Sequence, residues 1–180
     1  RILRQVAEAL QNAHEHRLYH RALGPQSLLV LDPEAPEPKV KIFNWQTGLR
    51  EGSTTSSRGV TGTEHITELV EDGAGAYVAP EAGSAPAEDG PLLDVFSLGA
   101  LAYRLLSGAP PAESASALRN VLSAGGGLNL AAAADGVAES LRTLVRSSTH
   151  PEVTHRLGSV SEFLEGLDAA STRLKNFVEK

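Results

Sequence analysis

Apolar side chains recur every three or four positions in the first part of the chain, from Ile2 to Ala13. This spacing places one apolar stripe along a helix and predicts a helix over residues 1–18. The stretch from Pro91 to Gly108 is far more apolar and leaves little polar face. A helix of that kind is buried on most sides, so we expect it in the middle of the core.

Two short runs with strand character follow the first predicted helix. Leu28–Leu31 is apolar and of strand length, and Lys39–Phe43 alternates between polar and apolar residues. Prolines are frequent between these runs, from Asp32 to Pro38, and mark a turn. The two runs therefore predict a β-hairpin.

The remainder of the chain divides into one irregular segment and a series of helices. Residues 44–90 are poor in apolar side chains and rich in Gly, Ser, Thr and Ala, which predicts a long irregular segment. Further helices are predicted near residues 113–124, 136–147 and 159–175, with a break at Gly125-Gly126-Gly127. With no internal repeat, the pattern predicts one mainly α unit with a minor β element.

Composition and charge narrow the class of protein. The chain has 180 residues, of which 41% are hydrophobic and 21% charged, as in one globular domain. No stretch reaches the roughly 18 apolar residues of a spanning helix, and the net charge of −6 argues against nucleic-acid and membrane partners. The absence of cysteine excludes disulfides and thiolate zinc sites. We expect a cytoplasmic protein, and a piece of a longer one, since the first residue is not Met.

Five short motifs occur in a fixed order along the chain. They are His20-Arg21-Ala22-Leu23 with Pro25, Asn44-Trp45-Gln46, Ala79-Pro80-Glu81, Asp94-Val95-Phe96-Ser97-Leu98-Gly99, and Arg156 after His150-Pro151. In this order and spacing they resemble the C-terminal lobe of a eukaryotic-type protein kinase, and bacterial serine/threonine kinases resemble the chain most. A narrower resemblance, which none of these motifs carries, is to the kinase-like component of phage-defence operons.

The resemblance spans residues 1–180 and has consequences for the fold. It implies a mainly α kinase C-terminal lobe with a small β-hairpin around the catalytic loop. It also implies that the smaller N-terminal lobe, with its Gly-rich loop and its Lys for the phosphates, lies upstream of this chain. ATP is therefore expected only together with that lobe.

Four positions depart from the kinase pattern, and all four carry chemistry in the family. The resemblance assigns Ala22 to the catalytic Asp, Gly24 to the loop Lys, Ser27 to the metal-binding Asn and Asn44 to the metal-binding Asp. A methyl group at Ala22 cannot accept a proton, and the neutral amide of Asn44 is a poor substitute for a carboxylate on Mg²⁺. No Asp lies between Asp32 and Asp72, and the nearest downstream carboxylate is Glu51. We therefore expect no magnesium site.

Other positions keep the residues that hold a kinase lobe together. The retained set is His20, Arg21, Ala79, Pro80, Glu81, Asp94 and Arg156. By the resemblance, Asp94 accepts hydrogen bonds from the catalytic-loop backbone, Glu81 pairs with Arg156, and Arg21 can contact a phosphorylated activation segment. The residues for chemistry are lost while those for structure remain, which predicts a catalytically inactive pseudokinase.

Several other residues have two interpretations. Ser53, Thr54, Thr55, Ser56 and Ser57 are candidate phosphorylation sites that would order their segment against Arg21, and the alternative is a plain polar loop. Trp45 either wedges between the lobes or packs into the core. The six histidines lack a cluster of carboxylates around them, so no metal site is predicted.

The sequence therefore predicts a non-catalytic regulatory or scaffolding module of a larger bacterial protein. Its partner is expected to be another protein or a neighbouring domain of the same chain. Two alternatives remain open. One is an active or residual Ser/Thr kinase that binds ATP through an upstream lobe, and the other is a nucleotide sensor that works without metal.

Overall fold

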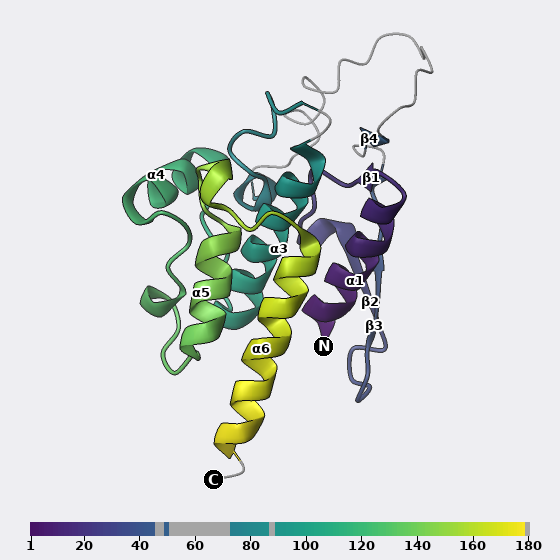
Figure 1. Cartoon of the computed structure of the whole chain (residues 1–180), viewed down its shortest axis with the longest axis vertical. Helices are drawn as coiled ribbons and strands as arrows, with labels where there is room; N and C mark the ends of the chain where they lie inside the picture. The colour runs from purple at the N-terminus through teal and green to yellow at the C-terminus, as the bar shows by residue number, and fades with distance from the viewer. Residues whose placement is uncertain (46–48, 51–72, 87–88, 179–180) are drawn as a thin grey trace.

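The structure is a computed structural model that describes residues 1–45, 49–50, 73–86 and 89–178. Five α-helices dominate it (Figure 1). They are α1 (Ile2–Glu15), α3 (Gly90–Ser107), α4 (Ala115–Gly125), α5 (Glu139–Ser148) and α6 (Val160–Val178). Short 3₁₀ turns lie at Pro25–Ser27, Ala74–Tyr77, Leu130–Ala132 and Val153–His155. The expected mainly α fold is confirmed.

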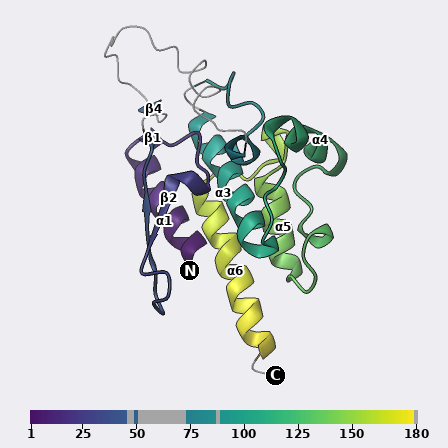
Figure 2. The same cartoon turned by 180° about the vertical axis from the view of Figure 1, so that it is seen from behind.

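Helix α3 forms the centre of the core, as its apolar sequence predicts. Eleven of its residues are buried, among them Phe96 and Asp94. Gly99 lets α5 approach closely, since a Cβ there would lie 2.2 Å from the Ser148 hydroxyl oxygen. The helix ends at Gly108, which adopts the left-handed conformation with φ +74°. The other helices surround α3 in both views (Figures 1 and 2).

Helix α1 buries the stripe that its spacing predicts and lies between the hairpin and the other helices. Val6, Ala7 and Leu10 are buried, and the helix packs against α3, α6 and strand β3. An ion pair between Arg4 and Asp168 joins the exposed sides of α1 and α6. The helix therefore links the sheet to the helical core.

The predicted hairpin is present. Strand β2 (Leu28–Leu31) pairs antiparallel with β3 (Lys39–Ile42), with Leu28 opposite Ile42 and Leu31 opposite Lys39. A second antiparallel pair was not anticipated: β1 (Leu18–Tyr19) pairs with β4 (Leu49–Arg50). Two residues per strand are too few to show a period-two pattern, so the sequence carries no signal for them.

Helix boundaries differ from the expected ones by a few residues where a cap decides them. Helix α4 begins after Ser114, whose hydroxyl accepts a hydrogen bond from the Ala117 amide. It ends at Gly126, which is left-handed with φ +61°. Helix α5 begins three residues later than expected because Gly136, with φ +75°, lies in a turn. Within the described residues, no helix is both long and apolar enough to cross a membrane.

Candidate functional site

The loop from His20 to Ser27 connects β1 to β2, and a carboxylate from α3 fixes its start. Asp94 accepts hydrogen bonds from two consecutive backbone amides, those of His20 at 2.9 Å and Arg21 at 2.6 Å. The residue lies at the start of the buried helix, so its position does not depend on the loop. The geometry expected for Asp94 is present.

The Asp94 carboxylate is fully buried and is compensated from a third side. The Nε2 atom of His14, on α1, lies 2.8 Å from one carboxylate oxygen. The His14 ring also meets Tyr19 edge to face, with 5.2 Å between the ring centroids. A buried carboxylate needs such partners, because burial without them costs several kcal/mol. Asp94 therefore joins α1, α3 and the loop at one point.

Arg21 is buried and points toward the segment that precedes α3. Its backbone is left-handed, with φ +68°, and its guanidinium donates to the carbonyls of Pro86 at 3.2 Å and Ala85 at 2.8 Å. Burial lowers the pKa of Arg21, and the charges of Asp94 and Asp89 partly oppose this. In this structure the guanidinium thus holds backbone carbonyls.

Three of the positions that carry chemistry in the family, Ala22, Gly24 and Ser27, lie in the same loop. Ala22 and Ser27 are both buried, and Ser27 accepts a backbone hydrogen bond from the Phe43 amide at 3.0 Å. At Gly24 an added Cβ would lie 2.5 Å from the amide oxygen of Gln26. The Gln26 side chain therefore covers the place where the family has a Lys side chain.

Asn44 follows the hairpin and faces the same loop. Its backbone is left-handed, with φ +63°, a conformation that Asn tolerates better than most residues. Its side-chain amide lies 3.5 Å from the Gln26 carbonyl, to which it donates. The structure thus brings Ala22, Gly24, Ser27 and Asn44 together around one loop, without a carboxylate among them.

Trp45 packs beside the loop. Its ring lies 4.9 Å from the His20 ring between centroids, and its Nε1 donates to the Ile42 carbonyl at 3.1 Å. His20 itself is buried, and its Nε2 lies 2.9 Å from the Phe43 carbonyl. The structure therefore packs Trp45 against the core, while a role between two lobes stays a prediction.

The side of the hairpin near Asn44 carries exposed apolar side chains. Leu29 on β2 is 50% exposed and Phe43, directly after β3, is 43% exposed. Exposed large apolar residues of this kind are single elsewhere in the described residues, at Leu105 and Val121. Two of them near one strand end indicate a contact surface.

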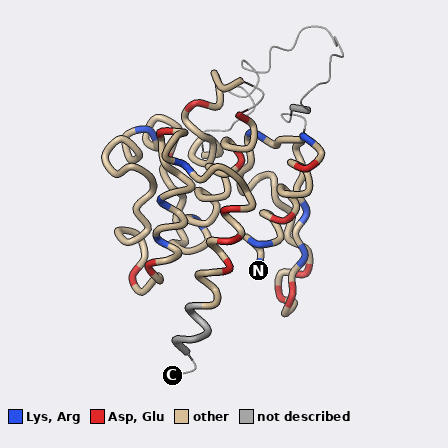
Figure 3. The backbone as a smooth tube through the Cα atoms, viewed as in Figure 1, with Lys and Arg blue, Asp and Glu red and all other residues tan. Residues whose placement is uncertain are grey.

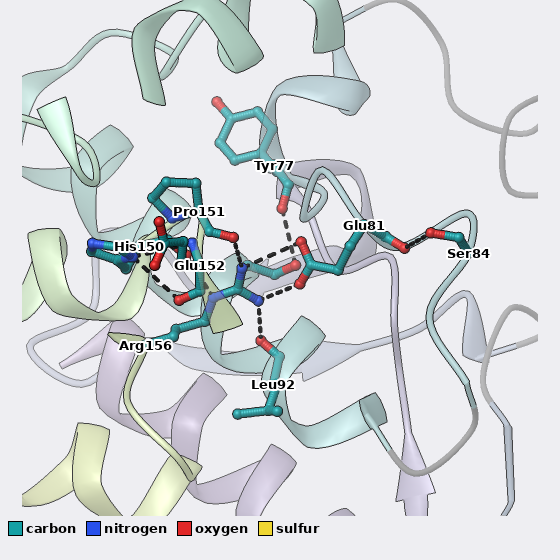
Figure 4. A network of polar contacts seen from close by, with 9 residues as sticks. Tyr77, Glu81, Ser84, Leu92, His150, Pro151, Glu152 and Arg156 are labelled. Carbon is teal, nitrogen blue, oxygen red and sulfur yellow. Dashed lines mark hydrogen bonds and ion pairs between the residues drawn. The ribbon is translucent and has the colours of Figure 1, made fainter. Parts of the chain in front are cut away.

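A second polar centre lies at Glu81 and Arg156, far from the loop in sequence (Figure 4). The Arg156 side chain is fully buried and the Glu81 side chain is 24% exposed. The guanidinium donates to both Glu81 oxygens, at 2.5 Å and 3.3 Å, and to the carbonyls of His150 and Leu92. It also lies 5.0 Å from the centroid of the Phe96 ring. This one side chain thus ties the Ala79-Pro80-Glu81 segment to α3 and the loop before α6.

Comparison with protein families decides what these features belong to. The protein kinase domain family matches residues 1–166. The chain belongs to the protein kinase family. The match includes the degenerate loop, the Ala79-Pro80-Glu81 segment and Arg156, so the resemblance seen in the motifs is confirmed.

Curated relatives of this kinase-family chain include bacterial serine/threonine kinases. It is 36% identical over 190 residues to the probable kinase PglW of Streptomyces coelicolor, which covers 96% of the chain and 12% of that protein. It is 33% identical over 114 residues to the serine/threonine-protein kinase PknF of Mycobacterium tuberculosis, covering 63% of the chain and 22% of PknF. The kinase AfsK of Streptomyces coelicolor is 30% identical over 151 residues, or 84% of the chain and 17% of AfsK. The chain thus spans less than a quarter of each of these three proteins.

The remaining candidate residues are the phosphorylation sites and the histidines considered as metal ligands. Residues 53–57 and His65 lie outside the described residues, so the phosphorylation hypothesis stays a prediction. Among the described residues, no group of three His, Asp or Glu side chains is arranged to hold a metal ion. His14 and His20 instead contact Asp94 and the Phe43 carbonyl.

Two residues of the kinase-like site were missed by sequence reasoning. Gln26 covers Gly24, and His14 contacts Asp94. The sequence places His14 six residues before His20 at the end of a helix, but this spacing does not reveal its contact with Asp94 on α3. Nothing in the sequence marks Gln26, since its contact depends on the turn at Pro25–Ser27.

Proposed function

We propose that this chain is a pseudokinase lobe that serves as a non-catalytic regulatory or scaffolding module. The observation that carries the proposal is the loop around Ala22, Gly24, Ser27 and Asn44, because none of these four side chains is a carboxylate. Phosphoryl transfer depends on positioned metal ions and on an acceptor for the hydroxyl proton. The side chains at these four positions supply neither.

Asp94 is the nearest buried carboxylate, and it is a poor substitute for the missing ones. Both of its oxygens accept hydrogen bonds from the loop backbone, and His14 contacts one of them. Using it as a base or as a metal ligand would release the amides of His20 and Arg21. We therefore do not expect Asp94 to rescue catalysis.

A protein partner or a neighbouring domain is the proposed occupant of the surface at Leu29 and Phe43. These exposed side chains lie on the side of the lobe that carries Asn44, where the family resemblance implies a smaller lobe. A cytoplasmic location fits the proposal. A role in phage defence stays a prediction, because nothing described above bears on it.

The first experiment is calorimetric titration of ATP, with and without Mg²⁺, into the chain extended by the upstream lobe. No heat of binding in either condition supports the scaffold. Binding that is equally strong without Mg²⁺ supports the nucleotide sensor instead. Tight binding that requires Mg²⁺ contradicts the proposal, because another carboxylate must then replace the one missing at Asn44.

A second experiment addresses the surface. We expect Phe43→Ser to weaken capture of the partner or of the upstream lobe, since it removes exposed apolar area from the contact. The matched control is Leu105→Ser, which removes a side chain of similar exposure, 51%, from the end of α3. Equal losses in both variants would assign the effect to general surface apolarity and contradict this contact.

A further inference from the structure

A pocket of about 480 Å³ lies between the loop after α4 and the outer face of α5. It includes no residue of the loop from His20 to Ser27 and none of the pair Glu81–Arg156. Its volume is within the range of small-molecule sites. One wall is formed by Gly126, Leu128 and Leu130, and α5 with the residues after it forms the other.

Basic side chains follow one another along the α5 side of the pocket. Arg142, Arg146 and His150 are spaced four residues apart, which places the two arginines on one face of the helix. Figure 3, which marks Lys and Arg in blue, shows blue segments along the helix that Figure 1 labels α5. In a chain with a net charge of −6, this wall is a local concentration of cationic groups.

Two donors converge beside Gly126. A Cβ on this residue would lie 3.4 Å from His150 Nε2 and 3.8 Å from a terminal nitrogen of Arg146. Gly126 itself is left-handed, with φ +61°, and ends α4. The absence of a side chain there keeps the space in front of both donors open.

The backbone of Glu152 holds the His150 ring at Nδ1. This nitrogen lies 3.1 Å from the Glu152 amide and 3.2 Å from the Glu152 carbonyl oxygen. When Nδ1 accepts from the amide, the neutral ring carries its proton on Nε2, and a protonated ring carries a proton on both nitrogens. In both of these states the Nε2–H group beside Gly126 is a donor that suits an anion.

The two arginines differ in whether a carboxylate already pairs with their positive charge. Arg142 pairs with Glu139, with 3.3 Å between Nε and a carboxylate oxygen. Arg146 is exposed, and within the part of the chain that the structure describes its guanidinium forms no hydrogen bond or ion pair. The positive charge of Arg146 is thus available to a ligand without breaking an existing contact.

The opposite wall is held in place. Its leucines, Leu128 and Leu130, are buried, whereas Asn129 and Ala131 of the same wall are exposed. The Leu128 amide donates to the Thr149 hydroxyl at 2.8 Å. The neighbouring Gly127 backbone lies so close to α5 that a Cβ there would be 2.3 Å from the Arg146 carbonyl. The pocket is therefore formed before any ligand arrives.

We propose that this pocket binds a phosphorylated small molecule with an apolar or aromatic part, such as a nucleoside monophosphate. The phosphate contacts Arg146 and His150 beside Gly126, because guanidinium groups bind phosphate oxygens in pairs. The apolar part lies along the wall that contains Leu128, Leu130 and Ala131. Four residues of helical rise separate Arg142 from Arg146, or about 6 Å, and His150 follows beyond the end of α5. This site is independent of the proposed pseudokinase function.

The test is equilibrium dialysis of the natural protein that contains residues 1–180, with radiolabelled AMP and with inorganic phosphate as probes. We expect AMP to bind more tightly than phosphate, because only AMP reaches the wall that contains Leu128, Leu130 and Ala131. Arg146→Gln removes a charged hydrogen-bond donor and should weaken AMP binding about tenfold or more. Ala131→Trp fills the pocket from an exposed wall position and should remove binding.

The matched control is Arg119→Gln, which removes one exposed positive charge from α4 outside the pocket. It should leave the affinity for AMP unchanged. AMP binding that survives both Arg146→Gln and Ala131→Trp belongs to another site and overturns the proposal. So does a failure of AMP to bind at millimolar concentration, or an equal loss in the Arg119→Gln control. Phosphate binding as tight as AMP binding overturns the role of the wall that contains Leu128, Leu130 and Ala131.

Discussion

The loop at Ala22 departs from the kinase pattern at the positions for chemistry, whereas the buried pair at Arg156 keeps both of its residues. Around Ala22, Gly24, Ser27 and Asn44, the side chains expected to carry charge are small or neutral. Around Arg156, the guanidinium still donates to Glu81 and to the carbonyls of His150 and Leu92. The difference indicates that buried polar contacts that hold the lobe together persist when the groups for chemistry are absent. Removing one partner of a buried ion pair is strongly destabilising, so a change at Glu81 or Arg156 alone would cost the lobe much of its stability.

The largest expected effect comes from removing Arg156 from its buried ion pair with Glu81. Arg156→Ala should lower the free energy of unfolding by about 3 kcal/mol, the lower part of the range for buried pairs, because Glu81 keeps some contact with water. Urea denaturation measures this loss. The control Asp168→Asn breaks the exposed pair with Arg4 and should cost less than about 1 kcal/mol. Equal losses in both variants would contradict the buried pair's structural role.

A smaller effect is expected at the carboxylate that fixes the loop. Asp94→Asn keeps one acceptor oxygen and replaces the other with a donor that faces a backbone amide. We expect a loss of about 1–3 kcal/mol, together with faster hydrogen exchange at the amides of His20 and Arg21. Asp32→Asn is the control, because this exposed residue is left-handed with φ +50° and Asn tolerates that conformation. Unchanged exchange at His20 would show that the loop does not depend on Asp94.

Alkaline pH should weaken the structural region modestly through Tyr77, which lies just before the Ala79-Pro80-Glu81 segment. Burial raises the pKa of the Tyr77 hydroxyl above its ordinary value near 10. The folded state then keeps a proton that the unfolded state releases, so stability is complete below about pH 10 and falls as the pH rises through the folded-state pKa. Tyr77→Phe should reduce this decline and leave the stability at pH 7 nearly unchanged. Identical pH slopes in both proteins would contradict it.

The smallest expected effect is a null result at the positions for chemistry. Ala22→Asp restores one carboxylate, but Ser27 and Asn44 still lack the groups for metal and Gly24 the charge for phosphate. We expect no phosphoryl transfer to a general Ser/Thr substrate in a radiolabelled ATP assay. The positive control is the variant in which the kinase family's residues replace Ala22, Gly24, Ser27 and Asn44 together. Robust transfer by Ala22→Asp alone would contradict the proposed loss of the site at several positions.

The sequence predicted correctly those elements whose hydrophobic pattern extends over many residues. Helix α3 followed from an almost continuous apolar stretch, and the hairpin followed from two runs separated by a proline-rich turn. The pairing of β1 with β4 did not, because each strand has two residues. The contact of Asp94 with the loop was expected only from the family resemblance, since its partners are backbone amides and any residue supplies those.

The remaining parts of the site depend on contacts that form only in three dimensions. The Gln26 side chain reaches Gly24 because a 3₁₀ turn brings it back over the loop. The pocket beside α5 draws on three segments between Gly126 and His155. The sequence does not predict that Arg146 and His150 both lie beside Gly126, because their position depends on how closely the Gly127 backbone approaches α5.

The Asp94 contact has a consequence for how freely this lobe can change. The start of the loop backbone is fixed by a residue 74 positions after His20 and 73 after Arg21, and within the loop that residue's hydrogen bonds are to main-chain amides. The start of the loop is therefore anchored without any contribution from the side chains at Ala22, Gly24 and Ser27. Small substitutions at these positions should leave the backbone of His20 and Arg21 in place, whereas larger ones must displace buried neighbours or the Gln26 side chain. The anchored start of the loop thus tolerates sequence change further along it, within the space that the neighbours leave.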